Sequence, residues 1–345
     1  MSPAAPLLEF LLEPLAPWLD SCETEDIAIQ QPGEAWIRQR GGWFREDVPL
    51  DLAALEEIAI LAGSLRKQEV GHLSPLCATE LPNGERMQIR APPAVATGSL
   101  SLTVRKPSAD LPPISEVRRR YRSEDWQRWR RYRAGRDMTG LLAIFDSGNL
   151  EEFLKAAVRA RLNILMTGAT GSGKTSLAKL VLTAIDHGER IIVIEDSLEL
   201  ALQQPNNVRL LYSKDGVSGA AIGAEDLLRA SLRMRPDRVL LQELREEQAA
   251  WIYAHQVVSG HPGSITTIHG HDAPAAFTRL FALCKGSRQG RGFDDTILLD
   301  LLPSAVDLII PLESRDGVFS IGAAWFVADA ARRGESAADL MRSAA

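Results

Sequence analysis

The chain has 345 residues, of which 45% are hydrophobic and 24% charged, and it carries a formal net charge of −6 at pH 7. This ordinary globular composition excludes a disordered tail protein, a collagen-like scaffold and a coiled-coil rod. The acidic balance disfavours a general nucleic-acid-coating role, because such proteins carry a basic excess that displaces counterions. The three cysteines stand far apart, so the sequence predicts neither a disulfide framework nor a zinc cluster and fits a reducing compartment.

The sequence contains no membrane-spanning pattern. No run of about 18 uninterrupted apolar residues occurs. The first twenty residues lack a basic leading segment and contain Glu9, Glu13 and Asp20, so they predict a proline-broken amphipathic helix rather than a secretion signal. We therefore expect a cytosolic protein that reaches a membrane only through other proteins.

Residues 1–107 mix strand-like and helical patterns. Apolar residues at near-helical spacing predict a helix over 50–65, with Asp51 as its cap. Pro82-Asn83-Gly84 predicts a hairpin turn. Strict alternation over 99–105 predicts a half-buried strand. We interpret this part of the chain as a small α+β domain.

Residues 108–139 have a different composition. Nine arginines fall between Arg118 and Arg136, interleaved with four aromatic residues and opposed by only Glu124 and Asp125. We interpret this segment as a basic linker, and the simplest interpretation is that its charged side chains are exposed to solvent. Contact with anionic inner-leaflet lipid is one alternative, since basic and aromatic residues favour that interface. Stacking on single-stranded nucleic acid is the other, although the acidic balance of the whole chain disfavours direct nucleic-acid binding.

From residue 140 onward, short apolar runs alternate with helical stretches. The runs predicted as strands are 163–166, 191–194, 239–241 and 264–268, and the predicted helices between them include 175–185, 225–233 and 247–258. Alternation of this kind predicts a buried parallel sheet with crossover helices.

A phosphate-binding loop follows the first of these runs. The sequence from Gly168 to Thr175 satisfies G-x-x-x-x-G-K-[ST] after a predicted strand and before a predicted helix, as the motif requires. Glycines allow the backbone N–H groups to converge on phosphate oxygens, and the helix N-terminus adds partial positive charge. We expect Lys174 to reach the β- and γ-phosphates and Thr175 to place its hydroxyl on Mg²⁺. The residues expected to bind nucleotide here are Gly168, Ala169, Thr170, Gly171, Ser172, Gly173, Lys174, Thr175 and Ser176.

Acids and a histidine follow the later strands. Glu195, Asp196 and Glu199 follow the second strand, and Glu243 follows the third. The carboxyl ends of parallel strands face the crevice where such folds bind ligands. His269 follows the fourth strand, where a sensor of the γ-phosphate would lie.

Together these motifs resemble the secretion ATPase superfamily, and most closely the traffic ATPases of type IV secretion and conjugative transfer systems. The resemblance rests on the phosphate loop and on the stretches 190–200, 232–245 and 259–269, and it extends over about 7–327. It implies a RecA-like P-loop ATPase domain over 140–345, preceded by the smaller α+β domain.

The resemblance also implies roles for single residues. Glu199 would polarise the attacking water, Glu243 takes the Walker B position, and His269 links that position to the γ-phosphate. Glu195 and Asp196 would support the metal, together with Thr175, or the fold. Arg86 and Arg105, from the N-terminal domain, would close over the nucleotide.

For the whole molecule, the resemblance implies Mg²⁺-dependent ATP hydrolysis by a homo-hexamer. Such a ring would dock with secretion-channel components on the cytoplasmic face of the bacterial inner membrane; an anionic membrane surface for Arg118–Arg136 stays one of the alternatives given above for the linker. Gln242 departs from the family, which usually has Gly before the Walker B glutamate, and the substitution puts the rate of turnover in doubt. A pilus extension or retraction motor and an ATP-gated assembly switch with little turnover are the alternatives.

Overall fold

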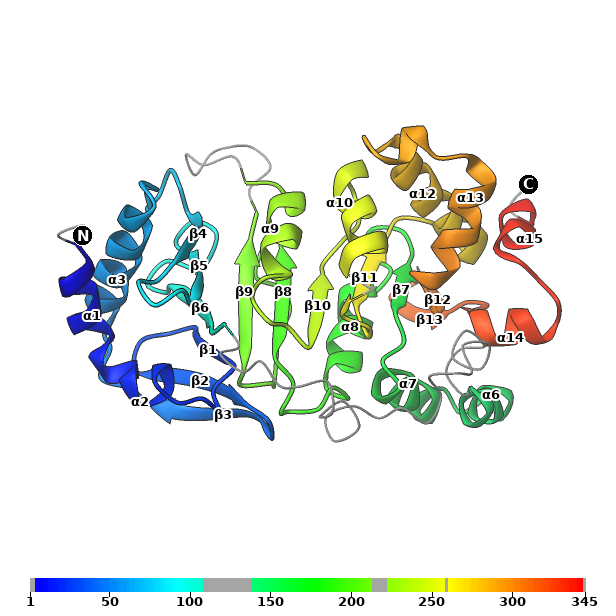
Figure 1. Ribbon diagram of the computed structural model, residues 1–345. Coiled ribbons are helices and arrows are strands. Elements are labelled where there is room, and N and C mark those ends of the chain that lie inside the picture. Colours follow the sequence, from blue (N-terminus) through cyan, green and yellow to red (C-terminus); the bar gives the residue numbers. More distant parts are fainter. Residues whose placement is uncertain (1–3, 108–137, 213–221, 258–259, 344–345) are drawn as a thin grey trace, which may run out of the picture.

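The computed structural model describes residues 4–107, 138–212, 222–257 and 260–343, which form two sheets with their covering helices (Figure 1). The predicted basic linker, including Arg118–Arg136, lies outside the described residues apart from its last two positions. The domain boundaries predicted at 107 and 139 therefore stay predictions. Among the described residues, no helix is both long and apolar enough to cross a bilayer.

The first sheet is antiparallel and has the order β3-β2-β1-β6-β5-β4. Its strands are β1 (Asp26–Ile29), β2 (Glu34–Gln39), β3 (Gly42–Asp47), β4 (Leu76–Glu80), β5 (Arg86–Arg90) and β6 (Ser101–Arg105). The helices beside it are α1 (Ala4–Leu12), α2 (Ala16–Leu19) and α3 (Leu52–Leu65).

The helix predicted over 50–65 is confirmed as α3, and the side chain of its N-cap Asp51 accepts a hydrogen bond from the Ala54 N–H at 2.8 Å. Leu55 and Ile58 on α3 pack with Leu8 of α1 and with the sheet residue Ile27 in one apolar core. The amphipathic pattern of the sequence therefore becomes a helical layer over one sheet face.

The second sheet has the order β13-β12-β7-β11-β10-β8-β9, with β14 paired to β12. Its strands are β7 (Ile164–Thr167), β8 (Ile191–Glu195), β9 (Asn207–Leu211), β10 (Arg238–Leu241), β11 (Ile265–Ile268), β12 (Leu308–Arg315), β13 (Val318–Ile321) and β14 (Trp325–Phe326). The strands from β9 to β12 along this order pair in parallel, so the predicted parallel sheet is confirmed.

Helices cover both faces of this sheet (Figure 1). One apolar cluster joins the sheet to α9 (Ala224–Ser231), α10 (Glu247–Ile252), α12 (Ala273–Gly286), α13 (Asp295–Leu301) and α15 (Ala337–Arg342). The other joins it to α6 (Thr139–Asp146), α7 (Leu150–Arg159), α8 (Lys174–Leu182) and α14 (Val327–Arg332). Burial on both faces explains why the strands read as continuous apolar runs.

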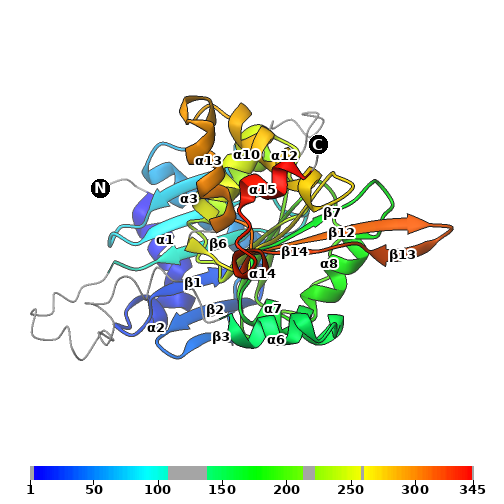
Figure 2. The same cartoon turned by 90° about the vertical axis from the view of Figure 1, so that its right-hand side faces the viewer.

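The β12–β13 hairpin, which the sequence analysis did not predict, extends past the other strands of the second sheet (Figure 2). It pairs Leu312 with Ile321 and Ser314 with Phe319. Most of β13 is exposed, so this strand lacks the apolar run that reveals a buried strand, whereas residues 308–312 of β12 form a buried apolar run that the prediction overlooked.

The two sheets meet along β9. The Leu211 N–H donates to the Ala94 carbonyl at 2.9 Å, and the fully buried Arg190 reaches Thr103 Oγ1 of the first sheet at 3.4 Å. Asp26 of β1 lies 3.3 Å from Arg235 and 3.1 Å from Arg105. Burial raises the pKa of Asp26 even though both guanidiniums act to lower it. The contact between the sheets therefore combines polar and charge-paired groups with an apolar part that includes Ala94 and Val95.

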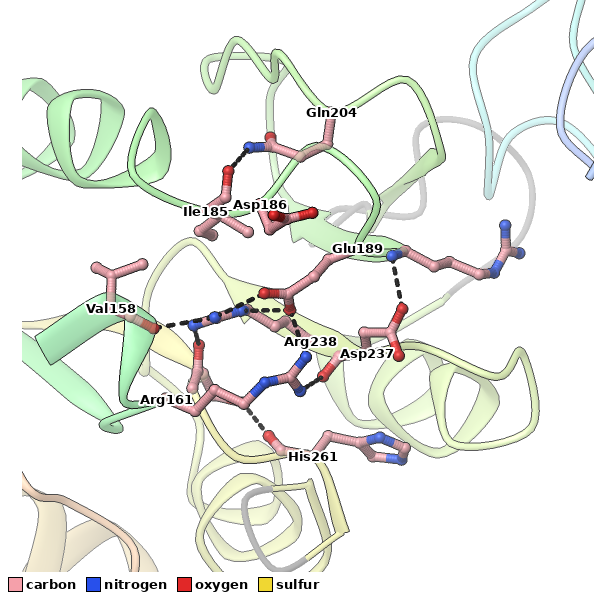
Figure 3. A network of polar contacts seen from close by, with 12 residues as sticks. Val158, Arg161, Ile185, Asp186, Glu189, Gln204, Asp237, Arg238 and His261 are labelled. Atoms are coloured by element: carbon pink, nitrogen blue, oxygen red, sulfur yellow. Dashed lines mark hydrogen bonds and ion pairs between the residues drawn. The ribbon is translucent and has the colours of Figure 1, made fainter. Parts of the chain in front are cut away.

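A buried ion-pair network lies where β8 and β10 begin (Figure 3). Arg238, whose side chain is 1% exposed, binds both carboxylate oxygens of Glu189 at 2.8 and 2.9 Å. Its guanidinium also donates to the Val158 and Gly263 carbonyls. Arg161 pairs with the same carboxylate at 2.8 Å. This network joins the starts of two strands to the end of α7 and to the loop before β11.

We expect Arg238→Ala to lower the free energy of unfolding by about 3–5 kcal/mol, because it leaves the buried Glu189 carboxylate with only part of its pairing. Urea unfolding followed by circular dichroism measures the change. The matched control is Lys155→Ala, which removes an exposed pair with Glu151 on α7 and should cost less than about 1 kcal/mol. Equal losses in the two variants would contradict the structural importance of the network.

Candidate active site

The loop between β7 and α8 has the backbone of a phosphate cradle. Gly168, Gly171 and Gly173 have φ values of +155°, +79° and +91°, conformations that glycine adopts without strain. A Cβ on Gly168 would lie 2.4 Å from the Leu312 carbonyl oxygen, and one on Gly173 would lie 2.9 Å from the ring of Phe319. The glycines of the motif are therefore required by backbone conformation and by close contact with the β12–β13 hairpin.

The loop lines a cavity of about 790 Å³. Residues 170–176 all border it, whereas Gly168 and Ala169 contribute their carbonyl oxygens beneath it. The other lining residues come from the ends of β8, β10 and β11, from Tyr212 after β9 and from the hairpin. The cavity thus lies at the carboxyl ends of the parallel strands, as expected for this sheet type.

Lys174 points back into its own loop. Its Nζ donates to the carbonyl oxygens of Gly168 at 2.6 Å and Ala169 at 2.8 Å. Burial lowers the pKa of this ammonium. No ion pair joins Lys174 to a carboxylate in the described part of the chain. The loop therefore holds a buried cation that is hydrogen-bonded by peptide carbonyls, while the Glu243 carboxylate acts on its charge from beyond ion-pair distance, and this arrangement suits an incoming anion.

Glu195 has a different place from the one expected. It is fully buried, and its Oε1 accepts hydrogen bonds from the N–H groups of Glu199 at 3.0 Å and Leu200 at 2.8 Å. Its Oε2 lies 2.8 Å from Arg209. Glu195 does not border the cavity, and both of its oxygens are engaged, so the expected metal-ligand role does not fit. Its carboxylate instead fixes the loop that carries Glu199.

Glu199 does reach the phosphate loop. Its Oε2 accepts from Thr175 Oγ1 at 3.4 Å, and its side chain borders the cavity. A carboxylate and a hydroxyl are the oxygen donors that Mg²⁺ prefers. The donor set beside Thr175 therefore fits a divalent cation.

Glu243 and His269 meet in the same cavity. His269 Nε2 lies 2.9 Å from Glu243 Oε1, and Arg245 Nη2 lies 2.6 Å from Glu243 Oε2. Arg245 also pairs with Asp196 at 2.8 Å. The carboxylates beside it raise the pKa of Arg245 above its usual value, with Glu243 as the main cause. Our sequence analysis did not predict Arg245 as a site residue, although it lies only two residues after Glu243 and could have been expected near the same strand end.

Gln242 stabilises the site geometry rather than filling the site. Its Oε1 accepts a hydrogen bond from the Asp196 N–H at 3.0 Å, and its backbone carbonyl accepts from Thr267 Oγ1 at 2.8 Å. These contacts join the ends of β8, β10 and β11, so the amide side chain holds the acid-bearing loop beside Glu243.

Arg86 and Arg105 lie away from the phosphate loop. Both border a separate cavity of about 630 Å³ with Arg66 and Arg233. Arg105 is bound to Asp26 there. The structure of this single chain therefore does not bring them to the loop, and their role over the nucleotide stays a prediction.

Comparison with known proteins gives this site its class. The family model described as "Type II/IV secretion system protein" matches residues 141–312. A parallel sheet with a phosphate loop, a Walker B glutamate and a histidine at neighbouring strand ends thus defines a P-loop ATPase of the secretion class.

Relatives that match most of the chain identify the family within this class of ATPases. The chain is 52% identical to Protein VirB11 of Rhizobium radiobacter over 97% of this chain and 98% of the relative. It is 37% identical to the type IV secretion system protein PtlH of Bordetella pertussis over 92% and 94%. Its fold matches the VirB11 ATPase of the Brucella suis type IV secretion system, solved in complex with sulphate, with a TM-score of 0.86, 33% identity and coverage of 96% and 97%. The chain belongs to the VirB11 family of type IV secretion ATPases.

The contacts of Gln242 predict that glycine at this position does not accelerate ATP turnover. The Gln242→Gly variant should hydrolyse ATP no faster than the parent. Its free energy of unfolding should be about 1–2 kcal/mol lower, because a side-chain hydrogen bond is lost and glycine leaves the unfolded backbone less restricted. Gln242→Asn keeps the amide but is one methylene shorter, so it should show the same lack of acceleration. Steady-state phosphate release and urea unfolding measure both. Faster turnover in the glycine variant would mean that Gln242 obstructs the site.

Proposed function

We propose that this protein is a traffic ATPase that hydrolyses ATP with Mg²⁺ to power type IV secretion or conjugative transfer. The observation that carries the proposal is the convergence of Lys174, Glu199, Glu243 and His269 on one cavity. In this proposal, the protein acts as a homo-hexamer on the cytoplasmic face of the inner membrane, docked to secretion-channel components. The full-length similarity to VirB11 proteins supports that setting.

The buried ammonium of Lys174 provides the affinity for the triphosphate. Its two carbonyl partners are dipoles of its own loop, and phosphate oxygens offer full negative charge at the same helix N-terminus. Lys174 therefore exchanges neutral acceptors for charged ones when nucleotide binds.

Thr175 is the group that would hold Mg²⁺, and the Glu199 carboxylate lies beside its hydroxyl. When bound, the metal neutralises negative charge on the phosphates. Because Glu195 is committed to Arg209 and to backbone N–H groups, it contributes by orienting this edge of the site.

Glu199 polarises the attacking water. The N–H of Glu199 is held by the buried Glu195 carboxylate, so a rigid loop presents its side chain. Glu243 is oriented from two sides, by His269 and by Arg245. Catalysis of phosphoryl transfer relies mainly on positioning and electrostatic stabilisation, and these contacts supply both.

Arg86 and Arg105 couple nucleotide to domain movement. Closure over the nucleotide requires Arg105 to leave Asp26 and approach the γ-phosphate, and loss of that phosphate favours the return. The differential contact of Arg105 with ATP and with Asp26, together with the neighbouring Arg86, would convert hydrolysis into rocking of the first sheet against the second.

Lys174→Ala tests the site assignment. Steady-state phosphate release should fall at least about a hundredfold, because a charge stabilising the transition state is removed. The matched control is Lys179→Ala, an exposed lysine on the same helix α8, which should keep parental turnover. Unchanged hydrolysis in Lys174→Ala would refute the assignment. A parent protein that binds ATP but releases no phosphate would instead be an ATP-gated assembly switch.

Variants of Thr175 test whether its hydroxyl binds Mg²⁺. Thr175→Ala should need more Mg²⁺ for half-maximal turnover than the parent, because a hydroxyl ligand is lost, whereas Thr175→Ser keeps that ligand and should behave like the parent. Phosphate release across a Mg²⁺ titration, starting from metal-depleted protein, measures the requirement. Identical titration curves for the alanine and serine variants would contradict this role for Thr175.

A further inference from the structure

Phe319, which borders the cavity, has no role in the proposed hydrolysis. Phe319 of β13 borders the cavity together with the phosphate loop, yet it is 56% exposed. A large apolar ring left open to solvent beside a charged site is a feature that a ligand can complete.

The hairpin register directs this ring toward the loop. Phe319 and Ile321 are two residues apart on β13, so they lie on the same face of the strand. Ile321 packs against the apolar cluster that contains Ala178 and Val181 of α8. Phe319 therefore faces the beginning of the same helix, whereas Val318, which is 68% exposed, belongs to the opposite face and does not border the cavity.

Contact with Gly173 fixes the position of the ring. A Cβ on Gly173 would lie 2.9, 3.1 and 3.2 Å from three ring carbons of Phe319. The ring thus packs on the backbone of the loop at the residue that begins α8, while its remaining surface stays open to the cavity.

Strand order separates the two ends of the cavity. The acids and His269 lie at the ends of β8, β10 and β11, on one side of β7. The β12–β13 hairpin lies on the other side of β7 (Figure 2). For a nucleoside triphosphate with its terminal phosphate toward Glu243, the direction away from β8 and β10 leads to the hairpin.

The other aromatic side chain among the described lining residues does not offer such a surface. Tyr212 is only 4% exposed and lies at the acidic end. Burial raises the pKa of its phenol, with the charge of Asp196 as a further cause. Phe319 is thus the aromatic ring with an accessible face.

We propose that Phe319 is the base-binding residue of the site and that its ring stacks against the aromatic base of the bound nucleotide. The proposal rests on nucleotide binding at the phosphate loop as proposed above. Stacking recognises the face of the base, so Phe319 adds affinity for any nucleoside triphosphate and does not select among their edges.

The test compares ATP with inorganic triphosphate, which has no base. Calorimetric titration of the full chain with Mg²⁺ present should show that Phe319→Ala weakens ATP binding by about tenfold, as expected for loss of one stacked base, while triphosphate binding is unchanged. Phe319→Trp keeps an aromatic face and should retain parental affinity for ATP. Val318→Ala, on the opposite face of the same strand, should change neither ligand.

Two results would overturn the proposal. Equal weakening of ATP and triphosphate in Phe319→Ala would mean that the ring acts only by packing on the phosphate loop. Unchanged ATP binding would mean that it does not meet the base. If instead the phosphate loop does not bind nucleotide, the result differs from both of these. Lys174→Ala would then leave the binding of ATP and of inorganic triphosphate unchanged.

Discussion

The site depends on a buried lysine whose ammonium is hydrogen-bonded by peptide carbonyls and forms no ion pair within the described residues. Lys174 lies over the oxygens of Gly168 and Ala169, in a loop that only glycines can form at this close approach to the β12–β13 hairpin. A desolvated cation without a paired carboxylate is costly, and a triphosphate relieves that cost. The surrounding carboxylates border the same cavity, yet their charge is taken up by partners of their own, such as Arg245 for Glu243. The loop therefore stays available to an anion.

The two ends of the parallel sheet carry different parts of the family signature. At the carboxyl ends, Glu243, Arg245 and His269 surround the cavity. At the amino ends, Arg238 and Glu189 form a buried network that joins two strands to α7 and to the loop before β11 (Figure 3). The stretch 232–238, which strengthened the resemblance to traffic ATPases, thus contributes to assembly of the sheet and to the contact of Arg235 with Asp26. A motif that identifies a family can be structural rather than catalytic.

Much of this arrangement could be predicted from the sequence, because it rests on local patterns. The apolar runs became β7, β8, β10 and β11, and Asp51 caps α3 as predicted. What sequence reasoning missed depends on contacts between distant segments. Glu195 reads as an acid at a strand end, and only its pairing with Arg209 and the backbone removes it from the cavity. The mostly exposed strand β13 has no strong period, so neither it nor Phe319 could be predicted. The position of Arg105 beside Asp26 follows from the pairing of β1 with β6, which are far apart in the sequence.

The most direct test of the account is a structure of the protein with Mg²⁺ and a non-hydrolysable ATP analogue. The account predicts that Lys174 Nζ leaves the carbonyl oxygens of Gly168 and Ala169 for the β- and γ-phosphates, with the γ-phosphate directed toward Glu243. A triphosphate bound elsewhere, or a Lys174 still hydrogen-bonded to its own loop while the analogue occupies the cavity, would contradict it.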